Sequence, residues 1–262
     1  MPEARVNGQT IWYEDSGGNG PPVVFSHGFL MDREMFAENI AALVPAYRCI
    51  VWDQRGFGKT GPAAGAFTYW DSAADLLALL DHLGIPRAAL AGMSQGGFIA
   101  LRAALLAPER VSALVLMDTR SGIDAPETIA AFGGLDAEWR ANGAQNVKPN
   151  LSGLLGIAHA PDAWFAKWDQ IGREELHYPI AALAGRDDIT ARIAEIDAPA
   201  LVIHGDADVA IAFEHGAALA AALPNSEPIV AVPGAGHAAN MQSPELVNAA
   251  LLEFLRRHLL TA

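Results

Sequence analysis

Short apolar runs alternate with amphipathic helical segments along most of this chain, and few folds accept such a pattern. The runs are continuously apolar, as expected of parallel strands that are covered on both faces, and the helical segments are long enough to serve as crossovers. The expected parallel strands are residues 23–26, 47–53, 88–92, 111–118, 200–204 and 228–232. An earlier run, 9–15, precedes a glycine-rich turn at 17–20 and suits an antiparallel hairpin at a sheet edge. The pattern predicts an α/β fold with a mostly parallel sheet flanked by helices.

Two helix starts are visible in the residue order. Thr68 is placed to cap a helix that carries Leu76, Leu79, Leu80 and Leu83. Ser243-Pro244-Glu245 opens the last helix, with proline at the first helical position and an acidic side chain near the positive end of the helix dipole. Both helices are expected to cover the sheet.

The alternation lapses between residues 120 and 196, which hold three of the six tryptophans and no clear strand. We interpret this stretch as a helical cap insertion, packed over one end of the sheet. The expected organisation is a core domain of residues 1–119 and 197–262 with the insertion at 120–196. A chain of 262 residues has room for one such domain and its insertion.

Charge and cysteine content exclude several classes of protein. The formal net charge is −13 without a basic cluster, so neither nucleic acid nor an anionic membrane is an expected partner. Apolar stretches are interrupted well before the ~18 residues that a membrane span needs, and the first residues lack the apolar core of a signal peptide. The single cysteine, Cys49, cannot form an internal disulfide. We expect a cytoplasmic globular protein; its oligomeric state, including a homo-oligomer, stays open.

The segment Gly92-Met93-Ser94-Gln95-Gly96 fits the pattern G-x-S-x-G, with an expected strand directly before it and an expected helix directly after it. Such a strand-to-helix turn exposes the serine hydroxyl, and small residues two positions either side relieve the crowding. The helix start behind the serine supplies free N–H groups and a positive dipole for a developing oxyanion. Ser94 is therefore the candidate nucleophile.

A serine hydroxyl needs a base to take its proton, and His237 is the best candidate among eight histidines. It lies in a glycine-rich loop after the last expected strand, where the carboxyl ends of parallel strands meet and ligands bind. His204 lies inside a strand and suits a core position. His159 and His177 lie in the insertion with no defined role, and the others fall on expected helices or precede Gly28.

The imidazole needs an acid to fix its tautomer and stabilise its charge. Asp208 lies furthest into the loop that leaves the strand 200–204 and is favoured for this role. Asp206, next to a glycine turn, is expected to bond local backbone, and Asp118 at the end of another strand is a second alternative.

The motifs that these residues form resemble those of the α/β-hydrolase fold superfamily, in particular its cofactor-free haloperoxidase-like esterases and enol-lactone hydrolases. The order Ser94, Asp208, His237 matches the nucleophile–acid–base order of that fold. The matching segments are Ser26-His27-Gly28-Phe29, Asp53-Gln54-Arg55-Gly56-Phe57-Gly58, Leu114-Val115-Leu116-Met117-Asp118, His204-Gly205-Asp206-Ala207-Asp208 and Gly234-Ala235-Gly236-His237. The resemblance implies an insertion after the sixth strand of the fold, and backbone N–H groups of Phe29 and Gln95 as the oxyanion hole. A serine at the nucleophile position disfavours epoxide hydrolysis and dehalogenation, which relatives with an aspartate perform.

Four further side chains are candidate substrate contacts. Trp164 and Trp168, four residues apart on one helical face, are either a lid over the substrate or a stripe that attaches the insertion to the sheet. His27 and Met93 flank the expected oxyanion and nucleophile positions, with core packing the alternative for Met93. No metal-ligand or phosphate-loop pattern occurs, so neither a metal nor another cofactor is expected.

The sequence thus predicts a serine hydrolase that cleaves a small, mostly apolar carboxylic ester or lactone through an acyl-enzyme. Acyl transfer, perhydrolysis or C–C bond hydrolysis by the same three residues stays an alternative. A ligand-binding receptor, in which the three residues hydrolyse a ligand only slowly, is a further alternative.

Overall fold

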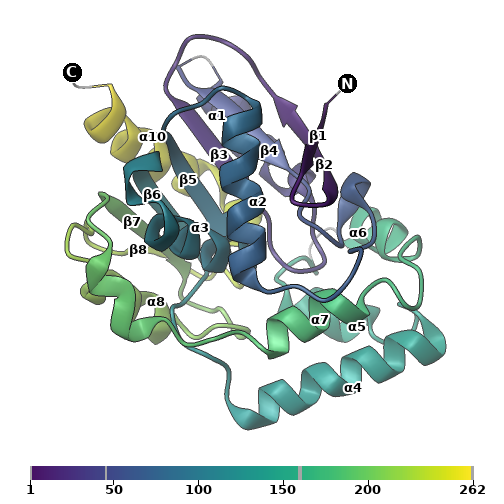
Figure 1. Ribbon diagram of the computed structural model, residues 1–262. Helices are drawn as coiled ribbons and strands as arrows, with labels where there is room; N and C mark the ends of the chain where they lie inside the picture. Colours follow the sequence, from purple (N-terminus) through teal and green to yellow (C-terminus); the bar gives the residue numbers. More distant parts are fainter. Residues whose placement is uncertain (1, 45, 159–160, 261–262) are drawn as a thin grey trace.

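An eight-stranded, mostly parallel sheet forms the centre of the molecule, as seen in a computed structural model that describes residues 2–44, 46–158 and 161–260 (Figure 1). The strands lie in the order β1-β2-β4-β3-β5-β6-β7-β8. Their bounds are β1 Glu3–Val6, β2 Gln9–Asp15, β3 Pro22–Ser26, β4 Arg48–Trp52, β5 Ala88–Met93, β6 Val111–Met117, β7 Ala200–Gly205 and β8 Val230–Val232. Strands β3 to β8 pair in parallel, and β1 and β2 are antiparallel. The predicted α/β fold class is confirmed.

The edge hairpin differs from the prediction in its turn. Strand β2 pairs with β1 across Asn7 and Gly8, not across the glycine-rich turn at 17–20. Both turn residues have positive φ, 47° and 77°, as a tight two-residue hairpin turn requires. The turn at 17–20 instead leads to β3, which lies one strand further in, because β4 pairs between β2 and β3.

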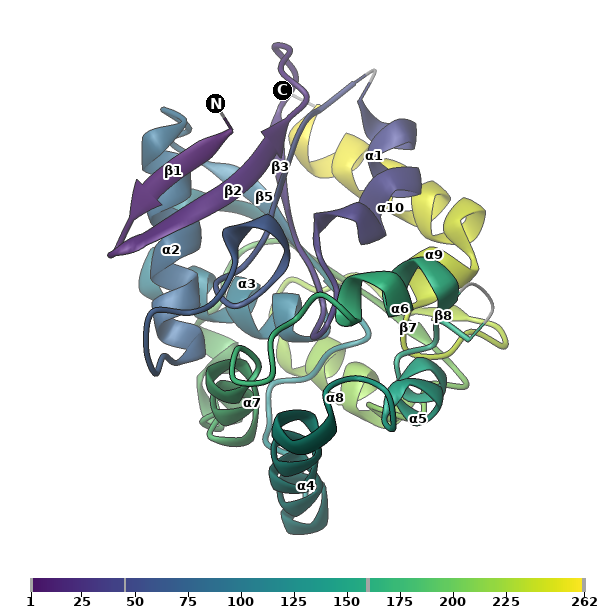
Figure 2. The same cartoon turned by 90° about the vertical axis from the view of Figure 1, so that its right-hand side faces the viewer.

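Helices cover both faces of the sheet (Figure 2). Helices α2 (Tyr69–His82) and α3 (Gln95–Leu106) pack on one face, and α1 (Ala37–Leu43) and α10 (Pro244–Leu259) pack on the other. Helix α8 (Phe213–Ala222) packs against β7. Thr68 caps α2 through a reciprocal capping box with Asp71. No helix in the described ranges is long and apolar enough to cross a membrane.

The segment 120–196, here called the insertion, leaves the sheet after β6 and returns at β7. It holds α4 (Pro126–Asn142), α5 (Lys148–Leu154), α6 (Pro161–Trp168) and α7 (His177–Ala184). Figure 1 shows α4, α5 and α7 beyond one end of the sheet. The loops that follow β3, β5, β7 and β8 end beneath the insertion, so the carboxyl ends of the parallel strands and the insertion enclose a common space.

Candidate active site

Ser94 stands at the sharp turn between β5 and α3, with φ 51° and ψ −116°. A non-glycine residue in this region carries strain of roughly 1–3 kcal/mol, which the surrounding structure must hold. The two glycines of the motif explain how the turn fits: a Cβ at Gly92 would collide with the carbonyl of Gly96, and a Cβ at Gly96 with the carbonyl of Ser26. The strand-turn-helix context predicted for Ser94 is therefore present.

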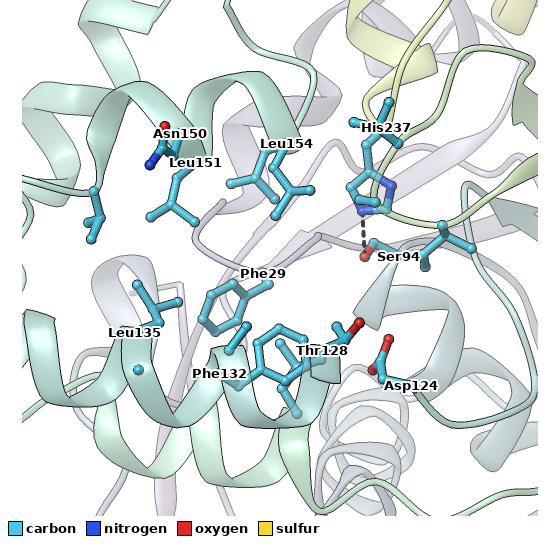
Figure 3. A pocket seen from close by; sticks show the side chains of 18 of the residues that line it. Phe29, Ser94, Asp124, Thr128, Phe132, Leu135, Asn150, Leu151, Leu154 and His237 are labelled. Atoms are coloured by element: carbon cyan, nitrogen blue, oxygen red, sulfur yellow. Dashed lines mark hydrogen bonds between the residues drawn. The ribbon is translucent and has the colours of Figure 1, made fainter. Parts of the chain in front are cut away.

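Three side chains from separate loops form one hydrogen-bonded line. His237 Nε2 lies 2.9 Å from Ser94 Oγ (Figure 3). On the other side of the ring, His237 Nδ1 lies 2.8 Å from Asp208 Oδ2. Since an ionised carboxylate only accepts, the imidazole carries its hydrogen on Nδ1 and leaves Nε2 free to accept the serine proton. All three residues are at least nine-tenths buried. The structure thus brings together the predicted nucleophile, base and acid; their catalytic roles stay predictions.

The Asp208 carboxylate is held on every side. Its Oδ1 accepts the backbone N–H groups of Ala210 and Ile211 at 2.8 and 3.0 Å, and its Oδ2 faces His237 and His204. Burial by itself would raise the pKa of this carboxyl. The hydrogen bonds from the two histidines and the backbone outweigh burial, so the pKa of Asp208 lies well below its ordinary value. The group is a fixed negative charge behind the His237 imidazole.

The two alternative acids lie elsewhere. Asp206 is exposed and its Oδ1 accepts the Gly234 N–H at 2.7 Å. This is a backbone bond, but it reaches the loop before His237, 28 residues away, and not the turn of Asp206 itself as expected. Asp118 is fully buried and accepts the N–H groups of Gly205 and Ala239, so it connects the ends of β6 and β7 to the loop of His237. Burial raises the pKa of Asp118 to about 7. Neither carboxylate has a hydrogen bond to His237 among the described contacts.

The backbone N–H groups of Phe29 and Gln95 have no acceptor among the described residues. Gln95 is the first residue of α3, where N–H groups have no intrahelical partner. Phe29 follows Gly28, and both Phe29 and Ser94 line the same cavity. The two N–H groups are therefore unused as donors in the described part of the chain, and their role as an oxyanion hole stays a prediction.

His27 holds the backbone next to Phe29 and does not line that cavity. Its Nε2 accepts the N–H of Gln54 at 3.0 Å, so its Nδ1 carries the hydrogen and donates to the Gly28 carbonyl at 2.8 Å. Complete burial lowers the pKa of His27, which favours the neutral ring that this arrangement needs. The Gln54 side chain adds a bond to the His27 carbonyl and accepts one from Gln95.

A cavity of about 610 Å³ opens at Ser94 and runs between α4 and α5 (Figure 3). Its walls between the two helices are apolar, and polar groups gather near Ser94 and at the far end around Asn150 and Glu138. The apolar lining comprises Phe132, Leu135, Val147, Leu151, Leu154 and Leu155. Phe29 stands where this groove meets the serine (Figure 3). The space suits an apolar chain attached to a group that reacts at Ser94.

The four candidate substrate contacts from the sequence lie off this cavity. Neither Trp164 nor Trp168 is among the described residues that line it, nor are His27 and Met93. Trp168 is buried and its indole Nε1 donates to the Leu30 carbonyl at 2.7 Å. The Met93 side chain lies against Gly28 in the core, the packing alternative considered for it. His159 lies outside the described residues.

A polar cluster near Ser94 has no counterpart in the sequence-based prediction. Arg120 and Arg186 both pair with Asp124, and Arg186 also donates to the Gly122 carbonyl and stacks 4.1 Å from the Phe98 ring. All three charged side chains line the cavity. The four-residue spacing of Arg120 and Asp124 is visible in the sequence, but nothing there joins them to Arg186.

One group of three side chains has the spacing of metal ligands: in Asp118, His204 and Asp208 the donor atoms lie within 4.8 Å of one another. The carboxylate oxygens of both aspartates already accept hydrogen bonds from backbone N–H groups or imidazoles. A cation bound here would have to use the carboxylate lone pairs that already accept these hydrogen bonds.

Comparison with known proteins finds similar sequences and similar structures. A family model described as alpha/beta hydrolase fold matches residues 21–160, and one described as TAP-like protein matches residues 178–260. The structure is similar to a thermophilic esterase from Thermogutta terrifontis (30% identity, 99% of this chain and 98% of that one, TM-score 0.87). It is also similar to the enol-lactonase from Burkholderia xenovorans LB400 (27% identity, 97% and 99% of the chains, TM-score 0.87). The sequence is 28% identical to a non-heme haloperoxidase from Rhodococcus erythropolis, over 95% of this chain and 97% of that protein.

Proposed function

Because this chain belongs to the α/β-hydrolase fold family, we propose that it is a serine hydrolase of small, mostly apolar carboxylic esters or lactones. The observation that carries the proposal is the line from Ser94 Oγ through His237 to Asp208, at 2.9 and 2.8 Å, at the opening of an apolar cavity. The predicted resemblance to this superfamily is confirmed by the comparisons, and named relatives support assignment as a hydrolase.

In the first step, Ser94 Oγ attacks the carbonyl carbon of the ester while His237 Nε2 takes the hydroxyl proton. The imidazolium that forms is stabilised by the fixed charge of Asp208 on its other nitrogen. His237 then gives the proton to the leaving alcohol oxygen, the C–O bond breaks, and Ser94 holds the acyl group. In a lactone the alcohol stays attached to the acyl chain.

The tetrahedral intermediate carries its negative charge on the former carbonyl oxygen. The N–H groups of Phe29 and Gln95 would donate to it, and one such donor is worth ~3–4 kcal/mol in a serine protease. A water molecule, with its proton taken by His237, then attacks the carbonyl carbon of the acyl-enzyme. The bond to Ser94 Oγ breaks, His237 returns the proton to Oγ, and the carboxylic acid leaves. These steps use only groups of the chain and water.

The shape of the cavity supports the substrate class. Six apolar side chains line the groove between α4 and α5, and at ~0.8 kcal/mol per buried methylene an alkyl chain gains affinity along it. Relatives named as an esterase and an enol-lactonase act on ester bonds of the same two kinds.

The test is a set of initial rates on p-nitrophenyl acetate, butyrate and octanoate, with wild type and Ser94→Ala side by side. We expect turnover in the wild type and its loss in the variant, with an unchanged circular dichroism spectrum and melting temperature. A folded wild type that is inert on all three esters and on simple lactones would overturn the proposal. Equal activity of Ser94→Ala would overturn the role of the serine.

A further inference from the structure

Helix α6 of the insertion is attached to the loop that carries the Phe29 N–H. The buried indole Nε1 of Trp168 donates to the carbonyl of Leu30 at 2.7 Å, across 138 residues of chain. Leu30 follows Phe29 directly, and no other donor to its carbonyl occurs among the described contacts. The bond therefore satisfies an otherwise unpaired carbonyl one residue from a proposed oxyanion donor.

The same loop contains a strained residue at this point. Leu30 has φ 59°, a left-handed conformation that a leucine rarely adopts. Such a residue persists only where its surroundings hold it in place. On the core side the loop is held by Asp53, which accepts from the backbone N–H and the guanidinium of Arg33 at 2.9 Å each. On the other side it is held by α6.

A second contact from α6 reaches the next turn of the loop. Lys167 Nζ lies 2.6 Å from Asp32 Oδ2 and 2.7 Å from Glu34 Oε2. Asp32 in turn caps the short 3₁₀ helix Arg33–Phe36 by accepting the Glu34 N–H at 2.9 Å. Two neighbouring side chains of one helix thus hold two neighbouring parts of the loop.

We propose that Trp168 is a positioning residue for catalysis, an inference that rests on the proposed function. By holding the Leu30 carbonyl, Trp168 fixes the direction of the Phe29 N–H toward the oxyanion. The insertion then has two roles, since α4 and α5 bind the acyl chain while α6 sets the oxyanion hole. Trp168 acts through Leu30 and does not touch the substrate, in agreement with its absence from the cavity wall.

The variant Trp168→Phe removes the donor and keeps an aromatic ring in the same place. A lost oxyanion donor lowers kcat by ~10²–10³-fold, and we expect a displaced one to lower it about tenfold with KM within about twofold. Binding of an alkyl trifluoromethyl ketone, which forms a tetrahedral adduct with the serine, should weaken by the same factor as kcat/KM. Hydrogen exchange at the amides of residues 30–36 should become faster.

Trp139→Phe is the matched control. Trp139 is fully buried in α4 of the same insertion. Its indole Nε1 has no hydrogen-bond partner in the described part of the chain, so the substitution removes no bond seen there. We expect its kcat, inhibitor affinity and loop exchange to match those of the wild type. Lys167→Met is a second variant, at a partly exposed residue that the core does not require. It should show the same pattern as Trp168→Phe, with a kcat loss of about threefold. It replaces Trp168→Phe as the test if that variant does not fold.

Faster exchange with unchanged kcat and inhibitor affinity would overturn the proposal, as would a raised KM at constant kcat. Equal losses in Trp139→Phe would also overturn it, because the effect would then be general destabilisation of the insertion. A wild type that cleaves no ester would defeat the proposed function alone. The exchange measurement needs no substrate and would still decide whether Trp168 holds the loop.

Discussion

The Nε2 atom of His204 lies 3.2 Å from the Oδ2 atom of Asp208. The same Nε2 lies 2.8 Å from the carbonyl oxygen of Ile211, which can only accept, so this nitrogen carries the hydrogen. Asp208 therefore receives two imidazole N–H groups on one oxygen and two backbone N–H groups on the other. All of its acceptor positions are used, and the carboxylate cannot rotate without losing bonds.

This arrangement predicts a sharp difference between two neighbouring aspartates. Asp208→Asn should lower kcat by about 10⁴-fold with little change in KM, because an amide there favours the wrong His237 tautomer. Asp206→Asn should keep kcat within about twofold, since its exposed side-chain oxygen can still accept from Gly234. Steady-state kinetics on p-nitrophenyl butyrate measure both effects. Similar losses of kcat in the two variants would contradict the assignment of Asp208 as the acid.

The groove between α4 and α5 predicts a chain-length effect. Ala131 lines the cavity from α4, and Ala131→Trp should exclude about two methylenes of a long acyl chain, at ~0.8 kcal/mol each. The value of kcat/KM for p-nitrophenyl octanoate is then expected to fall about tenfold, while that for the acetate stays nearly constant. Ala137→Trp, exposed on the same helix and off the cavity, is the control. A proportional fall for both esters would place the acyl chain elsewhere.

Two glycines should respond to alanine with opposite signs. Gly96→Ala places a methyl group against the Ser26 carbonyl and should lower the free energy of unfolding by more than ~3 kcal/mol. Gly133→Ala, inside α4 with open space around the new methyl, should raise it by ~0.5–1 kcal/mol. Urea denaturation followed by circular dichroism gives both values. A destabilised Gly133→Ala would mean that α4 is not helical there.

Cys49 provides a test of pH dependence. Burial raises the pKa of its thiol from 9.0 to about 12. Because the folded pKa is the higher one, this contribution to stability is complete below pH 9 and is lost as the pH rises toward 12. At pH 8 a disulfide reagent should therefore react with Cys49 only after unfolding. Rapid reaction of the native protein would show that the thiol is accessible.

The sequence predicted what depends on chain order and short spacing. Continuous apolar runs identified the six parallel strands, and the glycines around Ser94 identified its turn, because both follow from local backbone geometry; strand β1 was not predicted. The hairpin turn at Asn7 and Gly8 was not predicted, although Asn-Gly is a strong hairpin signal, because the glycine-rich turn at 17–20 is a competing turn signal at the other end of the same strand.

Contacts between distant side chains could not be predicted in the same way. The indole of Trp168 and the carbonyl of Leu30 are 138 residues apart, and only the folded insertion shows which way the ring points. The helical spacing of Trp164 and Trp168 correctly grouped them on α6. It did not show whether their side chains line the cavity or contact the loop beside it. The ion pair between Arg186 and Asp124 likewise joins residues far apart in the sequence, and only the folded chain shows it.

The insertion leaves from β6 and returns to β7, which are adjacent and paired strands. An excursion with such close ends can be exchanged for another of different length without altering the order of the sheet, so evolution or a protein engineer could transplant it to change specificity. The bond from Trp168 to Leu30 sets a condition on such transplants: a new insertion that shapes the acyl groove well but brings no donor for the Leu30 carbonyl would bind its substrate and convert it slowly.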